Sequence, residues 1–416
     1  MKSYRTILML TISLACFLML VLTACAGDPA VTTTGTTAVT TTNAITSTTA
    51  PVTTTPAATT TPAVTTAPPV AEGPYTLLSG TVRKSGASYK TTSGNVVLVI
   101  NDQVVEGDSQ FSVITNTSDE SATGIIFGYT DVNGVKSYYR FHTDKSNVYL
   151  RKVSGKSATL VGSHFGAGRG AGEYNLRVIF SDGKAYCYAR NRLFFTVELD
   201  YVGTKVGLAA DGNGVIFLSP KINKSVTKPD TVDTLLFGHS YFDGWGNWAK
   251  DMQATIDEFD LGTATNIGIG GSQSGNWYKL KEAIAAYQPK LGIYMIGIND
   301  MSAGRTPEAT VKDIEKTLLY VKEQLPDFEV VLLTVNHCPA KVSLKNNIIK
   351  TNELMRELAA EHDWIYIAEI ENSFNNGDTP DATWFTSDGL HLVGKSYTDV
   401  IVPAIKKALR GEDQPV

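Results

Sequence analysis

The C-terminal half of the sequence alternates short apolar runs with amphipathic stretches, and this pattern constrains the fold most. The apolar runs lie at residues 234–237, 262–267, 291–296, 330–335 and 364–367. Segments with apolar residues at helical spacing lie between and after the runs, at 277–284, 307–321, 346–360 and 397–409. Strands that alternate with helices predict a parallel sheet with helices on both faces. Functional groups of such sheets gather outside the carboxyl ends of the strands.

A serine follows the first apolar run, on a predicted turn between a strand and a helix. The run ends at Gly238, and Ser240 comes before residues 245–252, which have a helical pattern. A serine hydroxyl is a weak nucleophile until a base takes its proton. Asp388 precedes His391 by three residues, and such an Asp can hold the imidazole in one tautomer. Taken alone, the Asp-x-x-His spacing is also typical of an ordinary loop pair.

Two further loops at predicted strand ends offer hydrogen-bond donors. Gly268, Gly270 and Gly271 follow the second run, and without side chains they let backbone amides approach a substrate closely. Asn299 follows the third run and offers a side-chain amide. Donors of this kind stabilise the oxyanion of acyl transfer. A dinucleotide-binding interpretation of the glycine loop is poor, because Gln273 stands where the third glycine belongs.

These features together resemble the SGNH (GDSL-like) hydrolases over about residues 232–409. The four family blocks occur in order at the predicted strand ends, and they contain Ser240, Gly271, Asn299 and His391. The resemblance implies a flavodoxin-like three-layer α/β fold and serine ester hydrolysis that uses no metal or other cofactor. An ordinary α/β-hydrolase is a weaker match, because Phe242 stands where its Gly-x-Ser-x-Gly motif ends in glycine.

The resemblance also implies a role for each of these residues. Carried over by position, Ser240 is the nucleophile, His391 is the base and then the acid, and Asp388 orients His391. The Ser240 amide, the Gly271 amide and the Asn299 side chain form the oxyanion hole. The expected site is therefore a Ser-His-Asp triad whose serine and histidine come from opposite ends of the domain.

The sequence departs from the family pattern at two positions beside these loops. His239 stands before Ser240 where the family usually has Asp, and Ser272 stands where many members have Asp. The missing Asp usually helps to brace the oxyanion loops, so the sequence leaves their geometry open. His239 is not expected to be the base, because neighbouring side chains on a turn point apart. His337 follows the fourth run, and either a place beside the pocket or a structural role fits it.

Residues 73–224 have a different pattern, which predicts an all-β domain. Short runs rich in Val, Ile, Tyr, Phe and Thr alternate with turn signals, among them Asn133-Gly134, Asp182-Gly183 and Asp211-Gly212. Strands at this spacing indicate a sandwich or a barrel.

The second half of this domain resembles the last strands of concanavalin-A-like (laminin-G-like) jelly rolls attached to bacterial carbohydrate enzymes. The similar segments lie between Gly172 and Leu208. The resemblance implies a jelly-roll sandwich and leaves open whether the domain is purely structural or binds glycan. Glycan binding would need exposed aromatic rings, for which Tyr138, Tyr149 and Tyr188 are candidates. The alternation of strand faces does not choose among them.

The N-terminus predicts export and lipid anchoring. Lys2 and Arg5 precede an apolar run that is short for a membrane span, as in a signal peptide. The residues around Cys25 resemble the bacterial lipobox, which implies lipidation of Cys25 and loss of residues 1–24. A signal peptide that merely contains Cys25 is the alternative. Residues 25–72 are rich in Thr and Pro and lack large apolar residues, which predicts a disordered linker.

The charge balance limits the expected partners, and the domain order indicates the location and the reaction. The chain has 36 Lys and Arg against 41 Asp and Glu, a net charge of −5, and no basic block, so nucleic acid is not an expected partner. We expect a lipoprotein held at the bacterial cell surface, with a sandwich at 73–224 and an SGNH domain at 230–411. The expected reaction is hydrolysis of O-acyl esters, in particular O-acetyl esters, on a polysaccharide or other glycan. The alternatives are a lipase or lysophospholipase, and an inactive glycan-binding lipoprotein.

Overall fold

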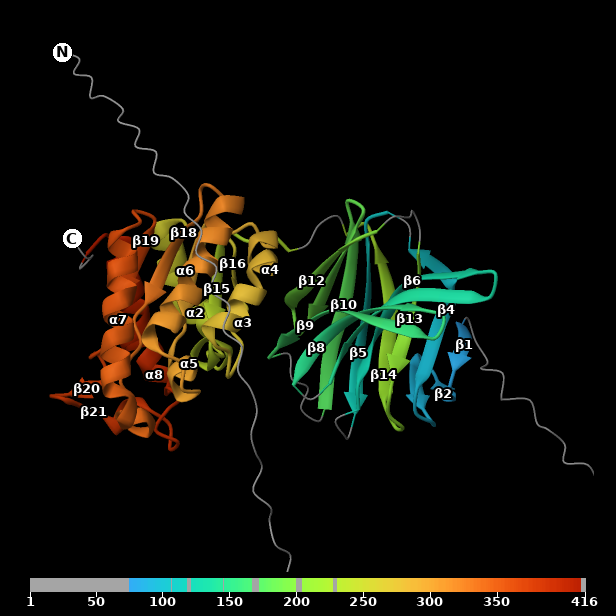
Figure 1. Ribbon diagram of the computed structural model, residues 1–416, viewed down its shortest axis with the longest axis horizontal. Coiled ribbons are helices and arrows are strands. Elements are labelled where there is room, and N and C mark those ends of the chain that lie inside the picture. The colour runs from blue at the N-terminus through green and yellow to red at the C-terminus, as the bar shows by residue number, and fades with distance from the viewer. Residues whose placement is uncertain are drawn as a thin grey trace, which may run out of the picture. The chain divides into compact units, whose positions relative to one another are not determined.

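The structure is a computed structural model that describes residues 75–105, 107–117, 121–144, 146–166, 172–199, 204–226 and 230–412 (Figure 1). The predicted signal segment 1–24, Cys25 and the linker at 25–72 lie outside the described residues. Export and lipid anchoring therefore stay predictions. Among the described residues, no helix has both the length and the apolar character that a membrane crossing requires.

An antiparallel β-sandwich forms the first part of the described chain, as the sequence predicts. Across the described residues it has two seven-stranded sheets (Figure 1). The first has the order β1-β4-β13-β6-β7-β8-β9, with bounds Tyr75–Ser79, Val96–Val105, Thr204–Ala210, Thr123–Val132, Val135–Thr143, Asn147–Ser154 and Ser157–Phe165. The second has the order β12-β11-β10-β5-β14-β3-β2, with bounds Arg192–Glu198, Lys184–Ala189, Gly172–Ser181, Ser109–Thr117, Ile216–Lys224, Ser88–Thr91 and Val82–Ser85.

Alternating burial and left-handed turns explain why these segments pair as strands. Along β8, Val148 and Leu150 are buried, whereas Tyr149 between them is partly exposed. The hairpins β6–β7 and β10–β11 turn at Asn133 and Asp182, whose φ angles are 53° and 51°. Asn and Asp tolerate this left-handed conformation, which two-residue hairpin turns require. These turn dipeptides were therefore reliable signals in the sequence.

Tyr188 was a wrong candidate for stacking on sugar rings. Its side chain is 0% exposed, and the guanidinium of Arg177 lies over its ring, 4.1 Å from the centroid. A ring enclosed in this way cannot face a glycan. Tyr138 on β7 and Tyr149 on β8 are partly exposed and stay candidates. Alternation shows that neighbouring residues face opposite sides of a sheet, but it does not show which side is the interior.

A parallel sheet organises the second part of the chain, which confirms the predicted α/β fold. Within residues 230–412 it has five strands in the order β16-β15-β17-β18-β19, with bounds Ala264–Asn266, Thr234–Gly238, Leu291–Met295, Glu329–Leu333 and Ile365–Ala368. Every residue of β15 and β17 is buried, as expected for a sheet covered on both faces. The first strand lies between the second and the third, which is the flavodoxin-like order.

Helices pack together in two groups beside this sheet. Helix α2 (Trp248–Phe259) packs against α9 (Val402–Leu409), and α6 (Pro307–Gln324) packs against α3 (Ser274–Lys279), α4 (Lys281–Ala286) and α7 (Lys345–Ala360). The shorter elements are α1 (Ser240–Asp243), α5 (Ile298–Ser302), η1 (Pro339–Leu344), β20 (Asn375–Asn376), β21 (Thr379–Pro380), η2 (Ala382–Trp384), α8 (Gly394–Ser396) and η3 (Tyr397–Ile401). Thr306 caps α6 by accepting a hydrogen bond from the Ala309 amide at 3.2 Å.

Three predicted helices differ in detail from the observed ones. The stretch 277–284 divides at Leu280, which ends α3 and begins α4. The stretch 397–409 starts with a π-helical turn, η3, and continues as α9. Pro403 accounts for this change, because it has no N–H to donate to the preceding turn. The helix expected at 245–252 begins only at Trp248.

Candidate active site

The turn that carries Ser240 depends on a glycine. Gly238 ends β15 with a φ of 144°, and a Cβ at this position would lie 2.0 Å from the Met295 carbonyl oxygen. No other residue fits that close approach to β17. The next amide, that of His239, donates a hydrogen bond to the same Met295 oxygen at 3.0 Å. Ser240 follows as the first residue of α1, at the carboxyl edge of the sheet.

The structure brings Ser240, His391 and Asp388 within hydrogen-bond distance of one another. His391 Nε2 lies 3.1 Å from Ser240 Oγ, and His391 Nδ1 lies 2.6 Å from Asp388 Oδ2. Asp388 Oδ1 also accepts hydrogen bonds from the Leu390 amide at 2.8 Å and the His391 amide at 2.9 Å. The imidazole and these donors hold the pKa of the Asp388 carboxyl far below its ordinary value. An ionised Asp388 favours the tautomer with hydrogen on Nδ1, which leaves Nε2 to accept the serine proton.

The loop that carries Asp388 and His391 is held by one internal hydrogen bond and by contacts to two other elements. The Thr386 amide donates to the His391 carbonyl at 2.7 Å, which closes the loop on itself. The hydroxyl of Tyr241, in α1, donates to the Leu390 carbonyl at 2.8 Å. The amide of Ala340, in η1, donates to the Gly389 carbonyl at 2.9 Å. These contacts fix the imidazole against the helix that carries Ser240.

The glycine loop lies beside Ser240, and Asn299 is hydrogen-bonded to that loop. A Cβ placed on Gly270 would lie 3.9 Å from the Ser240 Cβ, so the glycine loop passes close to the serine. Asn299 Nδ2 donates one hydrogen bond to the Ser272 carbonyl at 3.0 Å and has a second N–H. Within the described residues, no group accepts a hydrogen bond from the Ser240 or Gly271 amides. These three N–H groups are therefore still available as the donors that the family resemblance implies for an oxyanion hole.

His239 is enclosed, and its hydrogen bond goes to the backbone of α1. Its side chain is 1% exposed, and Nδ1 accepts a hydrogen bond from the Tyr241 amide at 3.3 Å, which caps α1. Burial lowers the pKa of the His239 imidazole to about 3, so the ring is neutral at physiological pH. The imidazole beside Ser240 Oγ belongs to His391 instead.

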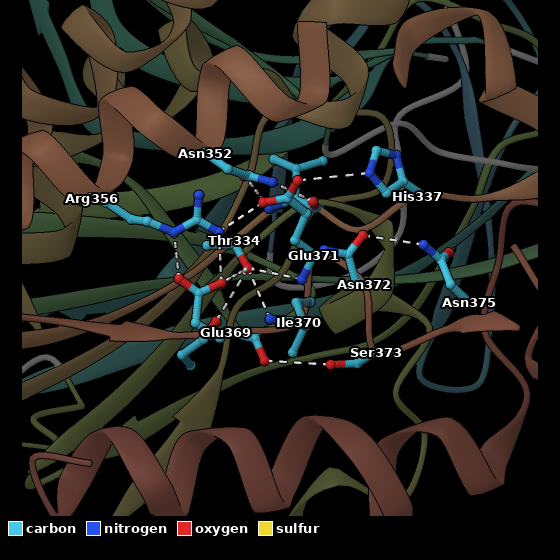
Figure 2. A network of polar contacts seen from close by, with 12 residues as sticks. Thr334, His337, Asn352, Arg356, Glu369, Ile370, Glu371, Asn372, Ser373 and Asn375 are labelled. Atoms are coloured by element: carbon cyan, nitrogen blue, oxygen red, sulfur yellow. Dashed lines mark hydrogen bonds and ion pairs between the residues drawn. The ribbon is translucent and has the colours of Figure 1, made fainter. Parts of the chain in front are cut away.

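His337 belongs to a polar network formed by α7 and the loops that follow β18 and β19 (Figure 2), and its own side chain is buried. Its Nε2 lies 3.7 Å from Glu371 Oε1, and its amide donates to the Glu371 carbonyl at 3.2 Å. Arg356 donates to Glu369 at 2.6 and 2.8 Å and to Glu371 at 2.7 Å. The Thr334 hydroxyl accepts from the Glu371 amide at 3.1 Å. These contacts favour the structural interpretation of His337.

Two carboxylates near the oxyanion loops were not identified from the sequence. Asp243 Oδ2 accepts a hydrogen bond from the Gly270 amide at 3.0 Å, and Asp300 accepts from Ser274. Asp300 follows Asn299 directly, so its position in the third block was a usable signal. Asp243 gave no such signal, because only the folded chain brings α1 next to the glycine loop.

A doubly wound α/β domain whose strand ends bring together a serine, a histidine and a carboxylate has the architecture of a serine hydrolase. Residues 233–398 match the model of the GDSL-like lipase/acylhydrolase family. The C-terminal part of the chain therefore carries a GDSL-like (SGNH) ester hydrolase domain, as its motifs predict. A search of curated proteins finds no match to this chain.

Solved structures similar to parts of the chain include a GDSL-like lipase from Bacteroides thetaiotaomicron, with 18% identity over 43% of this chain and 87% of that one and a TM-score of 0.36. A carbohydrate binding module from Bacillus subtilis has 12% identity over 36% of this chain and 96% of that one, with a TM-score of 0.32. A family two carbohydrate esterase from Cellvibrio japonicus has 13% identity over 82% of this chain and 97% of that one, with a TM-score of 0.33. At these identities and scores, the family assignment rests on the family model.

Proposed function

We propose that the protein hydrolyses O-acyl esters, in particular O-acetyl esters of carbohydrate, through Ser240, His391 and Asp388. One observation carries the proposal: His391 Nε2 lies 3.1 Å from Ser240 Oγ while its Nδ1 lies 2.6 Å from Asp388. This is the geometry that a serine nucleophile needs from its base and from the group that orients the base.

The proposed reaction proceeds through an acyl-enzyme. Ser240 Oγ attacks the acyl carbonyl carbon as His391 Nε2 takes the hydroxyl proton. The Ser240 amide, the Gly271 amide and Asn299 Nδ2 stabilise the oxyanion that forms. Collapse of the intermediate breaks the ester C–O bond, and His391 gives its proton to the leaving alcohol. A water molecule, deprotonated by His391, then attacks the acyl-enzyme and releases the carboxylic acid.

The openness of the site supports a large polar substrate. The His391 and Asp388 side chains are 45% and 49% exposed, so the base and its partner face solvent. An acyl group on a polymer can reach such a site without entering a tunnel, whereas a long lipid chain needs an extended apolar cavity. The β-sandwich that precedes the hydrolase domain supports the same choice, because Tyr138 on it is partly exposed and suits sugar stacking. Tyr149 suits it less, because His142 stacks on its ring with the centroids 5.2 Å apart.

Acetate release tests this proposal directly. Purified protein is expected to release acetate from acetylated xylan, glucomannan or peptidoglycan, and a Ser240→Ala variant is the matched inactive control. Absence of release from all three polymers by folded protein would overturn the proposed substrate. A preference for long-chain over acetyl p-nitrophenyl esters would support a lipase or lysophospholipase instead.

A covalent probe tests the catalytic residues separately from the substrate. A fluorophosphonate is expected to label Ser240 in the wild type and to fail in His391→Ala. Unlabelled wild-type protein would mean that the domain has lost its activity, which is the binding-protein alternative.

We also propose that the protein is exported and held at the bacterial cell surface by a lipid on Cys25. The motif around Cys25 and the linker at 25–72 support this, since together they would anchor the folded domains at a distance from the membrane. A Cys25→Ala variant is expected to leave the membrane fraction. Retention of that variant in washed membranes would contradict the anchor.

A further inference from the structure

A buried carboxylate lies between the two loops that supply the proposed oxyanion hole. Asp300 is 0% exposed and belongs to α5, directly after Asn299. Its carboxylate points at the start of α3, in the segment that follows Gly271. Ionised side chains are rarely buried unless paired and hydrogen-bonded, so this placement calls for a specific reason.

Asp300 holds the start of α3 through one residue. Its Oδ1 accepts a hydrogen bond from the Ser274 hydroxyl at 2.6 Å. The Ser274 amide lies 3.1 Å from Oδ1 and 3.0 Å from Oδ2 and donates to both. Arg305 Nε lies 3.2 Å from Oδ1 and balances the charge. Burial raises the pKa of Asp300, and the Ser274 donors oppose that rise.

The same two loops meet again at Ser272, which lies between Gly271 and Ser274 in the chain. Asn299 Nδ2 donates to the Ser272 carbonyl at 3.0 Å, and the Ser272 hydroxyl donates to the Gly238 carbonyl at 3.2 Å. The indole of Trp277 donates to that hydroxyl at 3.0 Å. Two sets of hydrogen bonds therefore hold the glycine loop, one from Asp300 to Ser274 and one from Asn299 and Gly238 to Ser272, and short stretches of backbone join them.

We propose that Asp300 is a positioning residue that sets the geometry of the oxyanion hole. By fixing Ser274 it fixes the path of the chain at Gly271, and by sharing α5 with Asn299 it fixes that side chain relative to the same loop. Asp300 thus takes over the bracing of the oxyanion loops, for which the usual Asp is missing in this chain. The inference rests on the proposed esterase function, because it concerns the same site.

The conservative variant Asp300→Asn tests the proposal. It keeps the shape of the side chain but places an NH₂ group among donors from Ser274 and Arg305, so at least one contact is lost. Loss of an oxyanion donor costs about 100- to 1,000-fold in rate, and a displaced donor costs less, so we expect kcat on p-nitrophenyl acetate to fall about 10- to 100-fold. KM is expected to change less than about threefold, because the hole acts on the transition state.

A matched control separates positioning from general stability. Asp313 also accepts a hydrogen bond from Arg305, but it makes no hydrogen bond to the glycine loop or to Asn299 within the described residues. Asp313→Asn is therefore expected to keep kcat within about twofold of the wild type. An equal loss of kcat in both aspartate variants would overturn the proposal, since it would trace the effect to Arg305.

A double-mutant cycle shows whether Asp300 acts through the hole. If it does, the effects of Asn299→Ala and Asp300→Asn on kcat overlap. The double variant then loses less activity than the product of the two single losses. Strict multiplicativity would overturn the proposal. Should Asp300→Asn unfold, Ser274→Ala replaces it in the cycle. That variant keeps the backbone hydrogen bond, and it is expected to lower kcat about two- to tenfold.

The outcomes for this inference and for the proposed function are distinct. If Ser240→Ala and Asn299→Ala retain wild-type activity, the proposed function fails. If those two variants lose activity but Asp300→Asn and Ser274→Ala keep wild-type kcat, the function stands and the inference fails.

Discussion

Arg356 is the residue through which we expect the polar network of Figure 2 to stabilise the hydrolase domain. Arg356→Met keeps the apolar stem but removes the guanidinium that bridges Glu369 and Glu371. Removing one partner from a buried ion pair costs about 3 to 5 kcal/mol. The Arg356 and Glu369 side chains are 32% and 34% exposed, so water screens part of the loss, and we expect unfolding free energy to fall by about 2 to 3 kcal/mol.

The pH dependence of this loss has a defined sign. Burial opposes ionisation of Glu371, but hydrogen bonds from His337 and Arg356 outweigh it and lower its pKa below the ordinary value of 4.5. A lowered pKa contributes stability above pH 4.5, and this contribution is lost as pH falls through the folded-state pKa. The difference in unfolding free energy between Arg356→Met and the wild type should therefore be full at pH 7, and it should shrink as the pH falls below 4.5.

Urea unfolding followed by tryptophan fluorescence measures this difference in the intact protein. All tryptophans of the chain lie in the hydrolase domain, at Trp245, Trp248, Trp277, Trp364 and Trp384, so the signal reports that domain alone. Lys350→Met is the matched control, because it removes an exposed ion pair with Glu353 on the same helix and should cost less than about 0.5 kcal/mol. Equal midpoints for Arg356→Met and Lys350→Met at pH 7 would refute the reasoning.

Three further predictions concern the site itself. Gly238→Ala should fail to give soluble protein, or should lose more than about 100-fold in activity, because its Cβ would overlap the Met295 carbonyl; expression yield and acetate release check this. Asp388→Asn should lower kcat by about 1,000- to 10,000-fold through the wrong imidazole tautomer of His391, with unchanged thermal stability in a melting scan as the control. His239 is buried and neutral, and because its pKa is lowered to about 3 it does not titrate between pH 5 and 8. When kcat/KM is measured over that range, a folded His239→Gln variant should therefore have the same midpoint of the acidic limb as the wild type. A shifted midpoint would mean that His239 titrates in that range.

The strands of the hydrolase domain were predictable because buried strands appear in the sequence as runs of apolar residues. A strand covered on both faces is apolar at nearly every position, so β15 and β17 appear in the sequence as nearly continuous apolar runs. Helix boundaries were less predictable. The break at Leu280 interrupts a continuous apolar pattern, so the pattern alone does not show it. Pro403 marks the turn before α9, but a proline does not show that this turn is π-helical.

The site was predictable for a topological reason. Strands of a parallel sheet end at one edge, so residues that follow Phe237, Ile267 and Ile296 in the sequence had to lie near one another. Contacts between side chains far apart in the sequence were not predictable. Arg356 meets Glu369 across a helix-to-strand connection, and only the packing of α7 against β19 brings them together.

The two departures from the family pattern have a common electrostatic consequence. His239 and Ser272 both stand where a carboxylate is usual, and both make their hydrogen bonds as neutral groups. Each absent carboxylate removes a negative charge that would oppose the oxyanion formed beside Ser240. Among the described side chains that link the two oxyanion loops, Asp300 is the buried anion, and Arg305 offsets its charge. If Asp300 braces the oxyanion hole as proposed, the pair with Arg305 would keep that brace while limiting the negative charge beside the oxyanion.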